Sequence, residues 1–324
     1  MKALVYDGPQ EMSYRDTAMA RARAGEALVE IEAVGICGSD MHAFLGHDAR
    51  RPAPLILGHE AAGTVRGGAL DGRRVTINPL VTCQSCVACG EGRENLCPDR
   101  QIISMPPREG AFAQYVAIPR QNLVDVPDHV SLSKAALAEP LAVGWHAARL
   151  ATSVLHGSSQ KPALVIGGGA IGLASALCLD AMGFADVTIC EPNPERADFL
   201  KTTCSARVIT VAEGAFDLII DAVGLSMTRQ TASNYVRPGG VIAHIGLAED
   251  SGGLDIRRMT LQEVTFIGTY TYTRDDFRDT AHAIFEGRLG PLNWCEHRSL
   301  SEGPVAFKEL QAGRVAAPKI MLHP

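Results

Sequence analysis

Residues 163–183, ALVIGGGAIGLASALCLDAMG, carry the pattern that decides the fold. An apolar run typical of a buried strand leads into Gly167, Gly169 and Gly172, and a helix-length apolar segment follows. In such a G-x-G-x-x-G turn the first glycine allows a tight turn, the second lets a pyrophosphate approach the backbone, and the third lets the helix pack on the strand. The stretch predicts a dinucleotide-binding strand, turn and helix, in which Ala170 and Ile171 begin the helix beside the pyrophosphate. A plain glycine-rich turn is the alternative.

An acidic residue stands where this kind of turn requires one, about 20 residues farther along the chain. Glu191 ends the next apolar run, in TICEPN. A carboxylate there binds both hydroxyls of the adenosine ribose and repels a 2′-phosphate, which favours NAD over NADP. Arg196 follows in PNPERADF, and its positive charge weakens that preference. A solvated strand end is the alternative interpretation of Glu191.

The chain changes character twice on either side of this stretch. Residues 1–141 show short strands and Gly/Pro-rich turns, as in GRRVTINP and AQYVAIP, and predict a mostly β domain. Residues 142–269 alternate apolar strands with helices, which predicts an α/β domain with a doubly wound parallel sheet of the Rossmann type. Residues 270–324 hold one expected helix, DDFRDTAHAIFEG, and a final PKIMLHP. This tail is expected to pack on the first part, so the α/β domain is an insertion.

Composition excludes several classes of partner. The formal charge of −6 and pI near 5.9 argue against nucleic acid and anionic membranes, because phosphate binding requires a surplus of Lys and Arg. No apolar run approaches the roughly 18 residues of a membrane helix. The start MKALVYDGPQ lacks the apolar core of a secretory signal, so we expect a cytoplasmic chain with reduced thiols that acts on small molecules.

Four of the nine cysteines lie within fifteen residues, in CQSCVACGEGRENLC. The spacing C-x2-C-x2-C-x7-C is compatible with zinc, with an iron–sulfur cluster or with disulfides. The last gap is four residues longer than in bacterial ferredoxins, and an odd number of cysteines suggests no paired framework. Zinc is therefore the leading interpretation of these four residues: Cys83, Cys86, Cys89 and Cys97.

A second set of metal-binding residue types is spread over three segments, GICGSDMH, LGHEAAG and LAEPLAVGWHA. A catalytic zinc takes three protein ligands from Cys, His and Asp or Glu, and keeps one position open. Cys37, His59 and either Glu60 or Glu139 would provide such a set. Each residue has an ordinary structural alternative, and spacing alone does not reject it.

These segments, the four-cysteine lobe (83–97) and VIGGGAIG occur in the order seen in the zinc-dependent medium-chain alcohol dehydrogenases. The chain resembles their polyol, sorbitol-type branch over essentially its whole length. The resemblance implies a GroES-like catalytic domain with one catalytic and one structural zinc per chain.

The resemblance also implies roles for single residues. Cys37, His59 and Glu60 would hold the catalytic zinc, with Glu139 ligating directly or through water, while the four lobe cysteines would hold the structural zinc. Asp40 would orient the zinc-binding histidine. Ser39 would accept the substrate proton and His42 would pass it to solvent, although a helix cap and a surface histidine are the alternatives.

The expected activity is NAD-dependent oxidation of a secondary alcohol of a polyol, sugar derivative or sugar phosphate to a ketone, by a homo-oligomer, a dimer or tetramer. A threonine-type dehydrogenase, a catalytically silent NAD-binding sensor and an iron–sulfur electron carrier remain alternatives. Thr271 and Tyr272 stand where sorbitol-type enzymes commonly show an Arg-Tyr pair, which weakens the case for sorbitol. Phe44 and Trp145 are candidates either for the substrate pocket or for the core.

Overall fold

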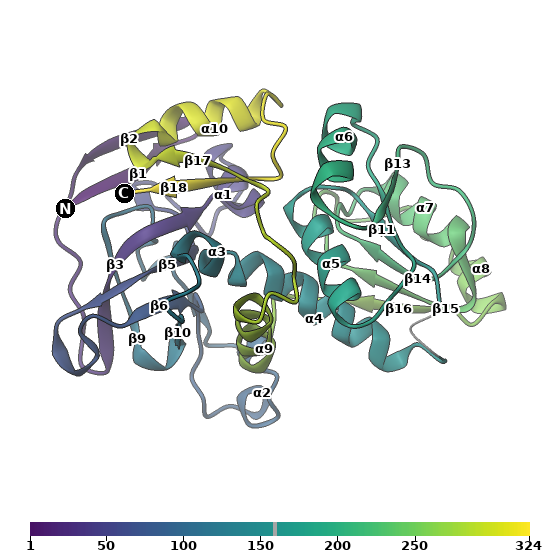
Figure 1. Ribbon diagram of the computed structural model, residues 1–324, viewed down its shortest axis with the longest axis horizontal. Helices are drawn as coiled ribbons and strands as arrows, with labels where there is room; N and C mark the ends of the chain where they lie inside the picture. Colours follow the sequence, from purple (N-terminus) through teal and green to yellow (C-terminus); the bar gives the residue numbers. More distant parts are fainter. Residues whose placement is uncertain (158–160) are drawn as a thin grey trace. The chain divides into compact units, whose positions relative to one another are not determined.

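The computed structural model describes residues 1–157 and 161–324, which form two compact units (Figure 1). The first unit comprises Met1–Glu139, Thr273–Glu286 and Trp294–Pro324, and the second comprises Pro140–Tyr272 and Gly287–Asn293. The sequence-based boundaries were 141 and 270, with the whole tail in the first unit. The structure differs at Gly287–Asn293, where Leu289 is buried and Arg288 lies over the Trp145 ring of the second unit.

The first unit is built on a seven-stranded, largely antiparallel sheet with the strand order β10-β6-β5-β3-β18-β17, and β9 also pairs with β3. The last strand of the chain, β18, pairs with β3, so this part of the tail packs on the first unit. The strands are β3 (Glu26–Gly35), β5 (Glu60–Arg66), β6 (Arg74–Ile77), β9 (Tyr115–Pro119), β10 (Leu123–Asp125), β17 (Cys295–Ser299) and β18 (Lys319–His323).

Smaller elements complete the first unit. One three-stranded sheet has the order β2-β1-β4, and a hairpin-like pair joins β7 to β8. These strands are β1 (Lys2–Gly8), β2 (Glu11–Asp16), β4 (Leu55–Ile56), β7 (Leu80–Val81) and β8 (Gln101–Ile102). The helices are α1 (Gly38–Phe44), α2 (Val87–Gly90), α3 (Leu132–Ala136), α9 (Arg274–Phe285) and α10 (Gly303–Gln311), with 3₁₀ turns η1 (Gly68–Leu70), η2 (Glu94–Leu96), η3 (Arg120–Asn122) and η4 (Leu300–Glu302).

The second unit is a six-stranded parallel sheet with the order β13-β12-β11-β14-β15-β16. This is the doubly wound order, in which the direction of winding reverses between β11 and β14 and ligands bind at the carboxyl ends of the strands. The strands are β11 (Ala163–Ile166), β12 (Val187–Cys190), β13 (Arg207–Ile209), β14 (Phe216–Asp221), β15 (Val236–His244) and β16 (Thr265–Gly268). The helices are α5 (Ala170–Ala181), α6 (Pro194–Thr203), α7 (Ser226–Tyr235) and α8 (Ile256–Leu261), and α4 (Ala138–Val154) begins at the unit boundary.

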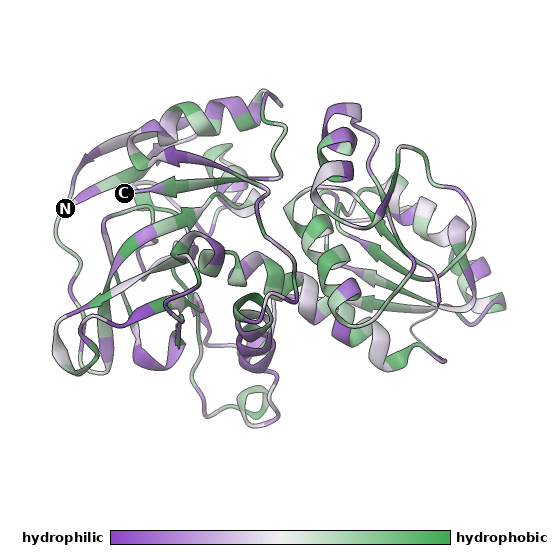
Figure 2. Cartoon of the chain, in the orientation of Figure 1, coloured by the Kyte–Doolittle hydropathy of each residue, from purple (hydrophilic) through white to green (hydrophobic). Residues whose placement is uncertain are grey.

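Burial follows the sequence pattern in both sheets. Strand β11 is buried at all four positions, as expected for a parallel strand covered on both faces, and Figure 2 shows the central strands of this sheet coloured as hydrophobic. In the first unit, Phe44, Phe112 and Phe307 lie in one core, with the Phe44 and Phe307 ring centroids 5.2 Å apart. Among the described residues, no helix is long and apolar enough to cross a membrane.

Candidate active site

Strand pairing brings the three predicted ligands of the catalytic metal together. Cys37 follows β3 and forms the N-cap of α1, while His59 and Glu60 stand at the start of β5. Strands β3 and β5 run antiparallel with Gly35 opposite Glu60, so the two ends that carry these residues are neighbours. One ligand atom from each of Cys37, His59 and Glu60 lies within 4.8 Å of the others.

Of the three residues, Glu60 gives the strongest indication that the group binds a further donor or a cation. Its side chain is fully buried, and its Oε1 accepts a hydrogen bond of 2.6 Å from the buried Lys319 Nζ. Its Oε2 is buried and has no hydrogen-bond partner among the residues that the structure describes. A buried carboxylate oxygen without a partner is costly, so the second oxygen requires a donor or a cation beyond those that residues 1–157 and 161–324 supply.

Gly35 makes the position of Glu60 possible. A Cβ atom placed on Gly35 would lie 2.1 Å from Glu60 Oε2, closer than nonbonded atoms approach. The strand that precedes Cys37 therefore needs a residue without a side chain, since any other residue would displace the carboxylate.

The His59 ring is held from several sides. Asp40 Oδ1 lies 3.4 Å from Nδ1, and Asp40 also accepts hydrogen bonds from the backbone N–H groups of Cys37 at 3.0 Å and Gly58 at 3.2 Å. Burial alone would lower the pKa of His59, but the charges of Asp40 and Cys37 outweigh it and hold that pKa well above its usual range. The Asp40 carboxylate beside the ring would also attract a metal cation at this place.

The proposed relay residues lie on α1. Ser39 is half-buried, with its Oγ 3.4 Å from His59 Nε2. His42 is exposed and three residues farther along the helix, so the two side chains share one face of α1. The structure thus places Ser39 against a predicted metal ligand and His42 at the protein surface.

The remaining candidates occupy different places. Glu139 is buried in the first turn of α4 and its charge raises the pKa of Lys319, but it is not one of the three grouped ligands. Phe44 is a core residue, because it is fully buried against Phe307. Trp145 is buried, with the Arg288 guanidinium 5.7 Å from its ring centroid.

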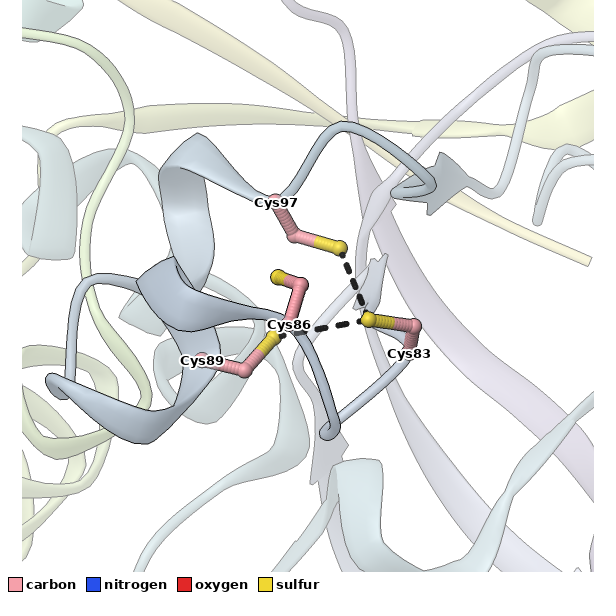
Figure 3. Close-up of side chains that lie close together, drawn as sticks. All are labelled: Cys83, Cys86, Cys89 and Cys97. Atoms are coloured by element: carbon pink, nitrogen blue, oxygen red, sulfur yellow. Dashed lines mark hydrogen bonds between the residues drawn. The ribbon is translucent and has the colours of Figure 1, made fainter.

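The four lobe cysteines also converge, with one sulfur from each within 4.8 Å of the others. Cys83 Sγ lies 3.5 Å from Cys97 Sγ and 3.9 Å from Cys89 Sγ, and Figure 3 shows the four side chains gathered in the lobe. The backbone N–H groups of Ser85 and Cys86 lower the pKa of Cys83 to about 6, which favours the thiolate. Four thiolates complete a tetrahedral zinc site and leave no position for a substrate.

The glycines of the dinucleotide turn have the geometry that a pyrophosphate requires. Gly167 has a φ of +94°, which permits the tight turn. A Cβ atom on Gly172 would lie 1.8 Å from Gly167 O, so this glycine is needed for close packing of α5 on the strand. A Cβ atom on Gly169 would meet nothing within 4 Å, which leaves space above the start of α5. Ala170 and Ile171 are the first residues of that helix.

Glu191 lies directly after β12 and faces this turn. Its carboxylate accepts hydrogen bonds of 2.8 Å from the backbone N–H groups of Gly168 and Asn193. Arg196 Nη1 is 3.4 Å from the same carboxylate and thus partly neutralises it. The predicted pair of ribose-binding candidates is therefore present beside the glycine turn.

Sequence reasoning missed three residues at the metal centre: Lys319, Arg51 and Ser104. Lys319 lies in the last strand of the chain, and only the pairing of β18 with β3 brings it to Glu60. No local pattern marks any of the three. On the second unit, Thr271 has a φ of +48° and a buried hydroxyl with no hydrogen-bond partner in the described part of the chain, while Tyr272 is fully buried.

Known protein families match the sequence of each of the two units. The family model described as "Alcohol dehydrogenase GroES-like domain" matches residues 23–128, and the one described as "Zinc-binding dehydrogenase" matches residues 170–286. These matches confirm the predicted fold class, a mostly β GroES-like domain with an α/β dinucleotide-binding domain.

Curated relatives match over most of their length. A sorbitol dehydrogenase of Bacillus subtilis is 32% identical over 295 residues, which cover 84% of this chain and 82% of the relative. An L-galactonate-5-dehydrogenase of Escherichia coli is 29% identical and covers 92% of this chain and 91% of the relative.

Among solved structures, galactitol-1-phosphate dehydrogenase from Escherichia coli superposes with a TM-score of 0.89 at 24% identity, covering 100% of both chains. At this level of identity the match supports the fold.

Proposed function

Because this chain belongs to the zinc-dependent medium-chain alcohol dehydrogenase family, we propose that it oxidises a secondary alcohol of a polyol, sugar derivative or sugar phosphate to a ketone with NAD. The observation that carries the proposal is the group of Cys37, His59 and Glu60, in which His59 and Glu60 are buried and one Glu60 oxygen has no partner among the described residues. The names of the curated relatives support the substrate class.

The donor set fits zinc. Thiolate, imidazole and carboxylate are the ligand types of catalytic zinc sites, and three protein ligands leave a coordination position open. Glu139 is close enough to Lys319 to contribute charge but stands outside the grouped ligands. We therefore propose Cys37, His59 and Glu60 as direct ligands, and Glu139 as a nearby carboxylate that would ligate directly or through water.

The chain's own side chains would handle the proton. A bound zinc ion supplies a Lewis acid that lowers the pKa of a substrate hydroxyl, and bound NAD supplies the hydride acceptor. Ser39 would accept the hydroxyl proton, and His42 would pass it to solvent from the exposed face of α1. Asp40 fixes the His59 ring from the other side, so that Nε2 faces the Ser39 hydroxyl.

Cofactor binding would use the second unit. The backbone at Gly169, Ala170 and Ile171 presents the start of α5 to a pyrophosphate, where unpaired N–H groups attract an anion. Glu191 would then bind the adenosine ribose and disfavour NADP, which carries a phosphate at that position.

A substrate screen tests the proposed function. Purified protein is incubated with NAD or NADP and with polyols, sugar acids, sugar phosphates, L-threonine and simple alcohols, and nicotinamide reduction is followed by absorbance. We expect turnover with NAD and a polyol-type substrate. Turnover with L-threonine alone would replace the substrate class, and tight NADH binding without turnover on any alcohol would favour a sensor.

Assembly and location are part of the same proposal. The edge strand β16 is partly exposed along its length, so a second copy could extend the sheet there and form a homo-oligomer. All nine cysteines are free thiols in the structure, which suits the reducing cytoplasm. Light scattering of the pure protein tests the first point: a monomer at micromolar concentration would contradict it.

A further inference from the structure

Ser104 occupies a strained and fully buried position beside the metal centre. Its φ is +75°, a left-handed conformation that residues with side chains rarely adopt, and its side chain has no exposed surface. Its Oγ lies 3.3 Å from His59 Nδ1, the same ring nitrogen that faces Asp40. The strain thus coincides with a contact to a proposed zinc ligand, where strained backbone is commonly functional.

Arg51 joins this serine to the relay hydroxyl. The Arg51 side chain is buried, and its Nε donates a 3.1 Å hydrogen bond to the carbonyl of Ser104. Its Nη1 donates to the carbonyl of Ser39 at 3.3 Å, and its Nη2 lies 3.5 Å from Ser39 Oγ. Asp48 balances the buried charge through a 2.7 Å ion pair. One planar guanidinium therefore spans the two segments that touch opposite nitrogens of the His59 ring.

We propose that Arg51 and Ser104 are a pair of positioning residues, which hold the His59 ring and the Ser39 hydroxyl in the geometry for metal binding and proton transfer. The inference rests on the proposed function for the proton-transfer part only. The metal-binding part depends on the contacts alone: Ser104 Oγ and Asp40 share His59 Nδ1, which leaves Nε2 directed toward Ser39 and the ligand group.

The backbone strain distinguishes this role from ordinary packing. Glycine adopts the conformation of residue 104 without penalty, so a purely structural site would be improved by it. Serine adds only one feature at this fully buried position, a hydroxyl directed at His59. The same argument applies to the guanidinium of Arg51. A lysine would keep the charge but could not donate to the carbonyls of Ser104 and Ser39 at once.

Ser104→Gly is the first test, with Gln10→Gly as its control. Gln10 is also a non-glycine residue of the first unit with a left-handed φ, +63°, but it is exposed. For Ser104→Gly we expect an unfolding midpoint near the wild-type value, with one of the two zinc ions released to a colorimetric chelator about 10–100 times faster and kcat reduced over a similar range. The KM for NAD should be unchanged, and Gln10→Gly should match wild type in every measurement.

Arg51→Lys is the second test. We expect it to lower kcat and to speed release of the same zinc ion, while the Arg51→Lys, Ser104→Gly double variant shows less than the sum of the two effects, because both changes loosen one ring.

Wild-type zinc release and kcat in folded Ser104→Gly protein would overturn the proposal, as would a loss of zinc that only parallels a lower unfolding midpoint in both variants. If Ser104→Gly does not fold, Arg51→Lys decides by the same criteria. Zinc release requires no substrate, so a failure of the proposed dehydrogenase activity would be seen separately as absent turnover in the wild-type protein.

Discussion

The two cysteine-containing clusters of the first unit are built in opposite ways. The lobe takes all four of its thiols from residues 83–97, and three of them are partly exposed. The group of Cys37, His59 and Glu60 is assembled by the pairing of β3 with β5, and His59 and Glu60 are buried. Around this group lie further charged residues that contact the proposed ligands, among them Asp40 and Lys319.

This difference indicates where chemistry is possible. A closed set of four thiolates has no free coordination position, and its neighbours serve the fold: Glu94 of the lobe accepts a hydrogen bond from the backbone N–H of Arg274 at the start of α9. The group of Cys37, His59 and Glu60 offers three proposed ligands, a Glu60 oxygen without a partner among the described residues, and the Ser39 hydroxyl beside His59. The lobe should therefore control stability, and the buried group should control turnover.

Cys37→Ser should have the largest effect of the substitutions that test this difference between the two clusters. Losing the thiolate should remove one zinc per chain and lower kcat/KM by more than about 100-fold, since a Lewis acid supplies several kcal/mol to such a reaction. The unfolding midpoint should change little. Zinc analysis with steady-state kinetics checks this, and turnover near the wild-type rate would break the assignment. Cys204→Ser, which alters a thiol outside both clusters, is the control.

Cys97→Ser should show the reverse pattern. We expect the unfolding midpoint to fall by about 5–10 °C, as a loss of about 2–3 kcal/mol of metal-coupled folding energy would give. The soluble yield should drop, while the protein that remains folded should keep most of its kcat. Thermal unfolding with kinetics on the soluble fraction measures both, and an unchanged midpoint would show that the lobe has no structural role.

Gly35→Ala should affect the buried group alone. The new methyl group would overlap Glu60 Oε2, so the carboxylate must move and zinc should be released from that site about 10-fold faster. Gly8→Ala is a matched control, because a Cβ atom there meets nothing within 4 Å and the residue also lies in a strand. Equal zinc retention in the two variants would contradict the proposed placement of Glu60.

Glu191→Ala should change the preference between NAD and NADP without affecting either metal cluster. Removing the carboxylate should raise kcat/KM for NADP by about 10-fold relative to NAD, because a 2′-phosphate would no longer meet a negative charge beside Arg196. Zinc content and the unfolding midpoint should stay at their wild-type values. An unchanged NAD to NADP ratio would remove Glu191 from the ribose site.

Asp221→Asn should have the smallest effect and compares Glu60 with a buried carboxylate that protein donors satisfy. Asp221 accepts hydrogen bonds from the N–H groups of Val223 at 3.0 Å and Gly224 at 2.9 Å, and from Thr228 Oγ1 at 2.9 Å. Burial alone would raise the pKa of Asp221, but His244 and these donors outweigh it and hold the pKa below its usual range.

The folded state therefore binds the Asp221 proton less readily than the unfolded state does. The resulting stabilisation is complete above the ordinary pKa and is lost as pH falls through the lowered one. Wild-type unfolding free energy should drop more steeply than that of Asp221→Asn between about pH 5 and about pH 3. Denaturant titrations at these pH values measure it, and parallel slopes would contradict the assignment.

A region could be predicted from the sequence when its residues lie close together along the chain. The lobe and the glycine turn are encoded within single short stretches, so spacing and the roles of Gly167, Gly169 and Gly172 were sufficient to predict them. Cys37 and His59 needed a family resemblance, since the strand pairing that joins them is not visible in local pattern.

Other features depend on tertiary structure alone. Lys319 reaches Glu60 because β18 pairs with β3, two strands at opposite ends of the sequence. Arg51 reaches Ser39 and Ser104 from an irregular loop. Gly287–Asn293 joins the second unit because of where Trp145 lies, which no local signal in that segment indicates. Long-range contacts of this kind are set by the fold, so sequence periodicity carries no information on them.

The central claim is that one chain holds two zinc ions with separate roles. Metal analysis of pure wild-type, Cys37→Ser and Cys97→Ser protein, combined with NAD-dependent turnover, tests it most directly. We predict two zinc ions in the active wild type, as the two ligand groups require, and loss of turnover only where the buried ion is lost. A fully active wild-type protein with fewer than two zinc ions per chain, or an active Cys37→Ser variant, would contradict the claim.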